Sequence, residues 1–318
     1  MLFRRLAILF VASLSLFAGR SFAQCSAPGS IAARAALLQW YPKTCGTRPW
    51  GVAFDGTNIW VTNWYGNNVT KLQGNTGTVL GTYPTANQGH GIAFDGTYIW
   101  VATSGTLVKI LASTGATVGT YSMPNQVNFA AFDGTNIWLE SYAESTAIKV
   151  LASTGAIVGT YKVGAQPEGI AFDGTNIWVA SWGTLTKLKA SDGTIVGTYP
   201  SGGRSQGIAF DGANIWVANQ EPQTVTKFLA STGALLGTYK AGLFPNQIAF
   251  DGKNVWITNG GSNSVTVLDA LSGALVGTYP TGDSPQGIAF DGTSMWIACE
   301  QTQTVTKIDA VRLLSPAH

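Results

Sequence analysis

The sequence predicts an all-β fold, a seven-bladed β-propeller of four-stranded antiparallel blades whose ring is closed by an N-terminal strand. A segment typified by residues 169–180, Gly-Ile-Ala-Phe-Asp-Gly-Thr-Asn-Ile-Trp-Val-Ala, occurs seven times. Successive copies are 40, 38, 40, 38, 40 and 40 residues apart, and a fixed period of this length is typical of repeat architectures. Every copy is followed by further strand-like segments. The copies begin at Gly51, Gly91, Phe129, Gly169, Gly207, Gln247 and Gly287.

The repeat over residues 167–200 shows how one blade is expected to fold. A short first strand over 170–172 ends at Asp173-Gly174, a hairpin signal because glycine accepts a positive φ without steric cost. The second strand covers 176–180, a loop covers 181–183, and the third strand covers 184–188. After a turn at 191–193 the fourth strand runs to Tyr199, and Pro200 is expected to end it because proline lacks a ladder N–H.

The second strand is apolar on both faces, so each sheet needs a neighbour on each side, as in a ring of propeller blades. Ile177 and Val179 lie on one face, and Trp178 and Ala180 on the other. A β-solenoid is the alternative, although its repeat is normally much shorter. One tryptophan per repeat at this position indicates a packing ladder between blades. These are Trp60, Trp100, Trp138, Trp178, Trp216, Trp256 and Trp296.

The last repeat lacks a fourth strand. Six repeats end in Gly-Thr-Tyr, whereas the chain stops eight residues after Ala310. The segment 36–42, Ala-Leu-Leu-Gln-Trp-Tyr-Pro, carries the same aromatic-proline ending, and we expect it to supply the missing strand and close the ring. The alternative is a helix over 31–38 with residues 311–314 as the closing strand.

The N-terminus has the pattern of a secretory signal peptide. Basic residues precede an apolar run over 6–18, and small residues stand at Ser21 and Ala23. A membrane anchor is the alternative, but this run is shorter than the about 20 residues that a span requires. We therefore expect a signal peptide over 1–23, a leader over 24–35, the propeller over 36–310 and a tail over 311–318. The location is secreted or periplasmic, and no other stretch is expected to cross a membrane.

Charge argues against nucleic acid as a partner. Cleavage after Ala23 removes Arg4, Arg5 and Arg20, which lowers Lys+Arg from 18 to 15 against 16 Asp+Glu. A net charge of about −1 lacks the basic footprint of nucleic-acid binding. We expect a monomer whose partner is a protein, peptide or glycan of unknown identity, with no cofactor.

The loops between the second and third strands, and those leading into each first strand, should share one face, where the repeats differ. The residue before each first strand should form a ring near the central channel, and three aromatic residues follow the second strands. We interpret these residues as a ligand-binding surface; the alternative is a polar channel that holds water. The ring is Trp50, His90, Asn128, Glu168, Gln206, Asn246 and Gln286, and the loop aromatics are Trp64, Tyr142 and Trp182.

Catalytic patterns are sparse. His90 and Glu168 are weak candidates for general acid–base chemistry, which requires hydrogen-bond reach. We expect no metal site, because no cluster of ligands at metal-binding spacing occurs. One lysine recurs on each of six third strands, and these lysines are expected to form a solvated stripe. They are Lys71, Lys109, Lys149, Lys187, Lys227 and Lys307.

Three cysteines in an exported chain leave one unpaired. Cys45 follows the N-terminal strand, and Cys299 begins the loop after the second strand of the last repeat, so both should lie on the variable face. We predict a Cys45–Cys299 disulfide that holds the ring closed, with Cys25–Cys45 as the alternative.

Ile59-Trp-Val-Thr-Asn63, with Gly-Ile-Ala-Phe-Asp-Gly-type segments before the tryptophan and Thr-Gly-Thr-Val-Leu-Gly-Thr-Tyr-Pro after it, resembles the YVTN family of propeller repeats. The unit is also similar to NHL repeats and to the streptogramin (virginiamycin B) lyases, which are seven-bladed propellers. The YVTN resemblance implies an exported binding or scaffold protein. The lyase resemblance implies paired histidines with acidic metal ligands, whereas this chain offers His90 alone on the relevant face.

Two functions follow as expectations. The first is an exported propeller that recognises a partner or small ligand on the variable loop face. The alternative is a lyase or hydrolase of the streptogramin-lyase-like type that uses His90 and Glu168. A purely structural module in an envelope assembly is a third possibility.

Overall fold

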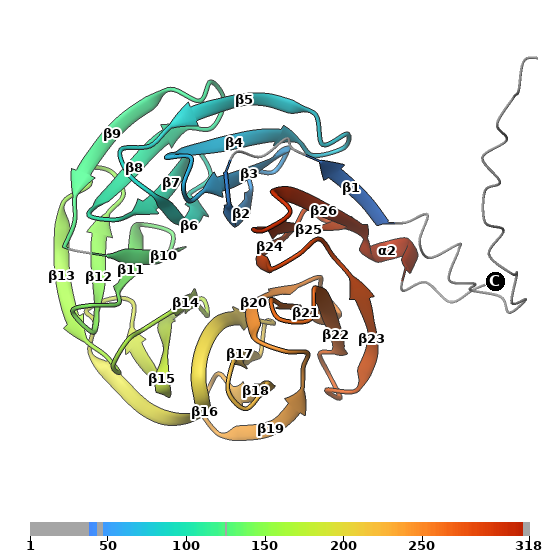
Figure 1. Cartoon of the computed structure of the whole chain (residues 1–318). Coiled ribbons are helices and arrows are strands. Elements are labelled where there is room, and N and C mark those ends of the chain that lie inside the picture. The colour runs from blue at the N-terminus through green and yellow to red at the C-terminus, as the bar shows by residue number, and fades with distance from the viewer. Residues whose placement is uncertain (1–37, 43–46, 125, 314–318) are drawn as a thin grey trace, which may run out of the picture.

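A computed structural model describes residues 38–42, 47–124 and 126–313; the expected signal peptide and leader lie outside these residues. The described chain consists of strands β1–β26 and one short helix, α2 (Ala310–Leu313). Figure 1 shows the sheets arranged in a ring about a central axis, with the chain running round it once. None of the helices in the described part of the chain is long and apolar enough to cross a membrane.

The all-β propeller is confirmed, but the prediction of seven four-stranded blades is wrong. Hydrogen bonding assembles the 26 strands into six sheets, five with four strands and one with six. The six-stranded sheet comprises β14 (Gly169–Phe172), β15 (Asn176–Lys189), β16 (Ile195–Phe210), β17 (Asn214–Asn219), β18 (Thr224–Leu229) and β19 (Leu235–Lys240).

Two long strands explain the difference, because they join two sequence repeats in one sheet. β15 continues through the loop predicted at 181–183, and β16 continues past Pro200 into the next first strand. The two strands pair with each other inside the predicted loop, where Trp182 lies opposite Arg204. A short connection alone does not join the strands, because the repeat of Trp100 has an equally short one and keeps β7 and β8 separate.

The five four-stranded sheets follow the predicted meander. The first sheet comprises β2 (Pro49–Phe54), β3 (Asn58–Asn63), β4 (Asn68–Gln73) and β5 (Val79–Pro84), and the second comprises β6 (Gly89–Phe94), β7 (Tyr98–Thr103), β8 (Thr106–Leu111) and β9 (Thr117–Ser122). The third comprises β10 (Val127–Phe132), β11 (Asn136–Ser141), β12 (Thr146–Leu151) and β13 (Ile157–Lys162), and the fourth comprises β20 (Pro245–Phe250), β21 (Asn254–Asn259), β22 (Ser264–Asp269) and β23 (Leu275–Pro280). The last comprises β24 (Pro285–Phe290), β25 (Ser294–Cys299), β26 (Thr304–Asp309) and the N-terminal strand β1 (Leu38–Pro42).

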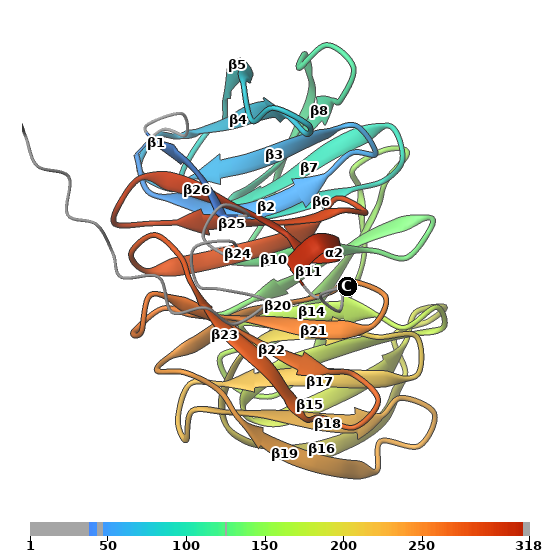
Figure 2. The ribbon, with the colours of Figure 1, turned by 90° about the vertical axis from the view of Figure 1, so that its right-hand side faces the viewer.

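Closure by the N-terminal strand is confirmed. β1 pairs antiparallel with β26, with Leu38 opposite Ile308 and Pro42 opposite Thr304. Figures 1 and 2 both show β1 lying along β26 at the outer edge of the last sheet. Residues 310–313 form α2, so the alternative in which the C-terminal tail closes the ring is wrong.

The repeated tryptophans form the predicted packing ladder between neighbouring repeats. All seven side chains are fully buried. Trp60, for example, packs with Ile99, Val101 and Ile110 of the next repeat. Burying a side chain of this size contributes several kcal/mol, and truncating one to alanine typically costs about 3–5 kcal/mol.

The Asp-Gly turn of each repeat also fixes the side chain of its tryptophan. Asp173 Oδ1 accepts the backbone N–H of Asn176 at 2.6 Å and of Thr175 at 2.9 Å, and Oδ2 accepts Trp178 Nε1 at 2.7 Å. The Asp–Trp hydrogen bond recurs in all seven repeats. The Asp-Gly turns therefore act as structural joints, and the predicted turn chemistry is correct.

The expectation that the lysines form a solvated stripe is wrong. Lys187 is 4% exposed, and its Nζ donates to the carbonyls of Ala230 at 2.7 Å and Ser231 at 3.3 Å in the next repeat. The ammonium also lies 4.9 Å from the ring centroid of Trp178. Equivalent bonds join Lys71, Lys109, Lys149, Lys227 and Lys307 to neighbouring repeats. The lysines link neighbouring repeats, because their long apolar stems cross the tryptophan faces and carry the ammonium groups to the carbonyls of the next repeat.

Candidate functional site

The two sets of variable loops share one end of the strands, as expected. In each repeat, the residue four positions after the buried tryptophan donates its backbone N–H to the connection that precedes the first strand. Trp64 N–H, for instance, donates to Arg48 O at 2.8 Å. The equivalent donors are Ser104, Tyr142, Trp182, Gln220, Gly260 and Glu300. We call this end of the ring the loop face, and the opposite end, with the Asp-Gly turns, the turn face.

The predicted ring residues lie on or directly before the innermost strands, which surround the axis in Figure 1. A cavity of about 110 Å³ adjoins them and is lined by glycines of the innermost strands together with larger residues such as Ile92, Phe129 and Gln247. The inner strands approach closely there: a Cβ on Gly51 would lie 2.5 Å from His90 O. The ring thus sits at the mouth of a narrow channel.

One arc of the ring is a chain of amide hydrogen bonds. Asn246 Nδ2 donates to Gln286 Oε1 at 3.0 Å and to Pro285 O at 2.9 Å. Gln220 Nε2 bridges Asn246 Oδ1, at 2.9 Å, and Gln206 Oε1. The arc continues when Gln286 Nε2 donates to Glu300 Oε2 at 3.0 Å. These mutual bonds hold the amides in fixed orientations.

A second arc is an aromatic cluster. The ring centroids of Trp50 and Trp64 are 5.0 Å apart, and those of Trp64 and Tyr65 are 4.8 Å apart and stacked. His90 lies 6.1 Å from Trp50 and 5.6 Å from Trp64, centroid to centroid. The Arg48 guanidinium lies 4.4 Å from the Tyr65 centroid. Tyr65 is 50% exposed, so this cluster presents an aromatic surface to solvent.

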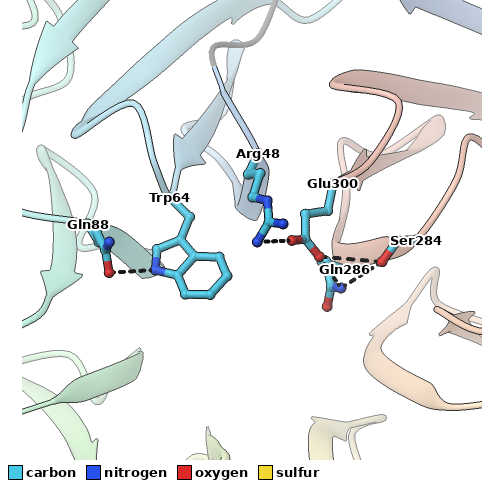
Figure 3. A network of polar contacts seen from close by, with 6 residues as sticks. All are labelled: Arg48, Trp64, Gln88, Ser284, Gln286 and Glu300. Atoms are coloured by element: carbon cyan, nitrogen blue, oxygen red, sulfur yellow. Dashed lines mark hydrogen bonds and ion pairs between the residues drawn. The ribbon is translucent and has the colours of Figure 1, made fainter.

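Polar contacts hold this cluster in place from both sides, as Figure 3 shows. Trp64 Nε1 donates to Gln88 Oε1 at 2.9 Å. Arg48 Nη1 forms an ion pair with Glu300 Oε1 at 3.1 Å, and Glu300 is in turn held by Gln286. The cluster is therefore anchored to three neighbouring repeats and is preorganised.

A smaller cluster lies further along the chain; its arginine and tryptophan hold the same repeat positions as those of the aromatic cluster but come from neighbouring repeats, and its glutamate holds a different position. Arg204 stands where Arg48 stands, two residues before the ring position. Its guanidinium lies 4.7 Å from the Trp182 ring centroid, and Nη2 pairs with Glu168 Oε1 at 3.2 Å. Trp182 is 40% exposed. The same combination of arginine, tryptophan and glutamate thus occurs twice on the loop face.

Glu140, which the sequence analysis passed over, lies beside Glu168. Its side chain is fully buried, and Oε1 accepts the backbone N–H of Phe129 at 3.1 Å. Burial raises its pKa well above the usual range, and the charge of Glu168 raises it further. Burial also raises the pKa of Glu168, against the opposing effects of Arg204 and Trp182. Asn128 completes this third arc of the ring.

The structure places the two catalytic candidates in different clusters. His90 contacts the aromatic rings, and burial lowers its pKa to about 4, so the imidazole is neutral at pH 7. Glu168 instead pairs with Arg204. Within the described residues, no group of three or more His, Cys, Asp and Glu side chains could hold a metal ion. The histidine-pair metal site that the lyase resemblance implies is not found among the described residues, where His90 is the single histidine; His318 lies outside them.

The other predicted residues have separate outcomes. Tyr142 is half-buried in the β11–β12 loop and donates its backbone N–H to Gln126 O at 3.2 Å. Cys299 is buried at the end of β25, with Sγ 3.4 Å from Thr306 Oγ1, and burial raises its thiol pKa. Cys25 and Cys45 lie outside the described residues, so the predicted disulfide stays a prediction.

Sequence reasoning missed Arg48, Tyr65, Glu140, Arg204 and Glu300. The available signal was a position-by-position comparison of the repeats. A charged residue at a position where most other repeats carry an uncharged one marks all of these five except Tyr65. The search considered only the position before each first strand and the aromatic loop residues.

No protein-family model matches the chain, and no curated protein matches it. Many solved structures share its fold, among them the following two. A streptogramin B lyase structure has a TM-score of 0.71 at 18% identity, covering 85% of this chain and 96% of that chain. A chain of a mitotic checkpoint complex has a TM-score of 0.73 at 13% identity, covering 86% of this chain and 94% of that chain. At such identities the likeness shows the propeller fold alone.

Proposed function

We propose that this chain is an exported binding protein that recognises a peptide or glycan on its loop face. The single observation that carries the proposal is the aromatic cluster of Trp50, Trp64, Tyr65 and Arg48. Its rings are partly exposed, yet hydrogen bonds and an ion pair fix their orientation. Exposed aromatic residues held rigidly are typical of recognition surfaces, because little conformational entropy is lost on binding.

The chemistry of the cluster favours a ligand with a flat face and a hydrogen-bonding edge. A sugar ring or an aromatic side chain could stack on Tyr65, while the adjoining amides offer donors and acceptors. Arg48 has five N–H donors, and its ion pair with Glu300 uses only part of them. The guanidinium could therefore also bind a carboxylate or hydroxyl group of the ligand.

The turn face offers a contrast that supports this choice of surface. Its polar side chains are largely engaged in the repeated Asp–Trp and Lys–carbonyl bonds. Leu243 and Phe244, which are 46% and 51% exposed, add further apolar surface to the loop face. A partner that covered both the aromatic cluster and these residues would span much of the ring.

Export and repeat family belong to the same proposal. The basic start, apolar run and small residues at Ser21 and Ala23 support a signal peptide and a secreted or periplasmic location. The Ile59-Trp-Val-Thr-Asn63 segment supports a YVTN-type relationship. Sequencing the N-terminus of protein recovered from medium and periplasm would test cleavage after Ala23.

The lyase or hydrolase alternative is less well supported. It rests on the fold shared with the streptogramin B lyase. His90 and Glu168, the residues it requires, have their closest contacts in separate clusters. General acid–base work by the pair requires them to come within hydrogen-bond reach of one substrate.

The binding proposal is tested with an array of immobilised oligosaccharides and peptides, probed with the chain lacking residues 1–23. We expect selective capture that Tyr65→Ala and Trp64→Ala both reduce by about tenfold or more, since loss of one stacking anchor costs about 1–2 kcal/mol. Leu236→Ala is the matched control, because Leu236 is an equally exposed apolar residue on the outer strand β19. Capture that survives both aromatic substitutions would exclude this surface.

A further inference from the structure

Glu140 and Glu168 are both exceptions within the repeat, because no other repeat carries a carboxylate at either position. They belong to neighbouring repeats, the third and the fourth. The penultimate residue of β11 is Glu140, whereas the equivalent residues are Thr62, Ala102, Ala180, Ala218, Thr258 and Ala298. Glu168 is the single acid of the ring. A fully buried carboxylate that interrupts a series of threonine and alanine requires a physical explanation.

The threonines show where a side chain at this position points. Thr62 Oγ1 accepts Gly51 N–H at 2.8 Å and donates to His90 O, at the next ring position, at 2.7 Å. Thr258 makes the same pair of bonds with Gln247 and Gln286. The side chain therefore spans from its own repeat to the ring residue of the following one.

Glu140 makes the bond to the backbone N–H of its own repeat. An ionised carboxylate has no proton, so it cannot make the bond to the carbonyl at the next ring position. Oε1 accepts Phe129 N–H, as the threonine oxygen does. Oε2 is left without a donor, and the geometry of the threonines leads us to place it on the side of the next ring position, which is Glu168. The effect of the Glu168 charge on Glu140 agrees with this proximity.

Three oxygens in this region have no donor in hydrogen-bond geometry among the described residues, although the Trp182 side chain lies close enough to Glu168 to lower its pKa. They are Asn128 Oδ1, Glu140 Oε2 and Glu168 Oε2, and all are buried. The other oxygen of Glu168 is taken by Arg204. Arg204 pairs with Glu168, whereas no cationic side chain of the described residues acts on the pKa of Glu140. Arg204 Nε is itself left without an acceptor. Leaving such groups unsatisfied costs several kcal/mol.

We propose that Asn128, Glu140 and Glu168 bind a Ca²⁺ ion at the inner edge of the loop face. The donors are exclusively oxygen, which favours a hard cation over zinc or copper. Ca²⁺ accepts an irregular set of six to eight oxygens and completes it with water, whereas Mg²⁺ demands near-ideal octahedral geometry. A single proton on Glu140 would supply one donor, whereas a cation can contact all three oxygens together.

The site has an entry path. Asn128 and Glu168 each retain 8% exposure, whereas Glu140 has none. An ion and its waters can therefore arrive from the loop face at the mouth of the channel and contact Glu140 last. The site is separate from the aromatic cluster, so it stands or fails independently of the proposed ligand-binding function.

The test is calorimetric titration of the chain lacking residues 1–23 with CaCl₂ after dialysis against a chelator. We expect saturable binding of one ion with a dissociation constant below about 1 mM, the weak end of protein calcium sites. A calcium concentration near 100 times the dissociation constant should raise Tm by about 5 °C. MgCl₂ should bind at least about tenfold more weakly.

Glu140→Thr is the decisive variant, because it restores the residue found at Thr62 and Thr258 and should fold at least as well as the parent chain. It should abolish the calcium-dependent rise in Tm. Glu144→Gln is the charge-matched control, since Glu144 is exposed on the next loop of the same sheet, and it should titrate like the parent.

Two results would overturn the proposal. One is a parent chain with no saturable calcium binding; if its Tm also rises relative to that of Glu140→Thr on acidification from about pH 7 to pH 5, a proton alone neutralises Glu140. Both chains carry His90, so this comparison removes the opposing effect of its protonation. The sign follows from the raised pKa: the folded state binds the proton more tightly, so stability is gained as pH falls. The other is calcium binding that survives Glu140→Thr, which would place the ion elsewhere.

Discussion

The turn face and the loop face are built on the same backbone, yet their side chains behave in opposite ways. At the turn face the aspartate of each repeat accepts the same tryptophan N–H at 2.6–2.7 Å. At the loop face the equivalent positions carry an aromatic ring, an imidazole, amides and a carboxylate, which form three different arcs. Uniformity marks packing between repeats, whereas divergence marks the surface that is free to acquire a function.

The largest effect expected from this comparison is the loss of stability when a tryptophan of the ladder is truncated. Trp178→Ala should lower the free energy of unfolding by about 3–5 kcal/mol, because a fully buried indole and its hydrogen bond to Asp173 are lost. Urea denaturation followed by circular dichroism measures this. A loss below about 1 kcal/mol would contradict the assignment of the ladder to stability.

The next largest effect is expected at the loop face, where protonation of His90 should lower the free energy of unfolding. The folded-state pKa of His90 is lowered to about 4 from an ordinary 6.5, because burial disfavours the imidazolium. The unfolded chain therefore binds the proton more readily, and stability should fall by about 3 kcal/mol as pH drops from 6.5 to 4. His90→Gln should flatten this part of the stability–pH profile, measured by urea denaturation at each pH. An unchanged profile would mean that His90 is solvated in the folded state.

The buried lysines provide a smaller effect at the turn face. Lys187→Met keeps the apolar stem but removes the ammonium that donates to Ala230 O and Ser231 O. We expect a loss of about 2 kcal/mol, the usual range for hydrogen bonds from a charged donor. Lys189→Met is the control, since Lys189 is exposed on the same strand, and the two midpoints of chemical denaturation should differ accordingly.

The smallest expected stability change is at the loop face. Tyr65→Ala should alter the free energy of unfolding by less than about 1 kcal/mol, because half of the side chain is already exposed. The same variant is expected to lose ligand capture. A large loss of stability would mean that the aromatic cluster belongs to the packing of the ring.

The elements that sequence alone predicted are those fixed by contacts within one repeat or repeated in all of them. The Asp-Gly turns and the alternation around Trp178 fall in this class. The strand at 38–42 has a distant partner, and it was predictable because it carries the aromatic-proline ending of the repeated fourth strand. The joined sheet was not predictable, because it depends on the pairing of Trp182 with Arg204 between two repeats. The lysines were misjudged for a related reason: their partners are carbonyls about 40 residues away in sequence.

The candidate site was predictable in position but not in chemistry. Residues before each first strand do lie at the mouth of the channel, as expected. Their bonding was not visible, because it depends on the orientation of side chains such as Gln220 and Arg48 that lie outside the ring. Glu140 went unnoticed because a carboxylate on a buried strand carries no local motif, and only alignment of the repeats shows it as an exception.

The pairing of β1 with β26 also determines the order of events during synthesis. Pro42 and Thr304, which lie opposite each other, are 262 positions apart in the chain. β1 therefore remains unpaired until β26 has been synthesised. A nascent or truncated chain is an open arc whose two end sheets expose strand edges, so molecular chaperones or rapid completion of the chain have to protect it.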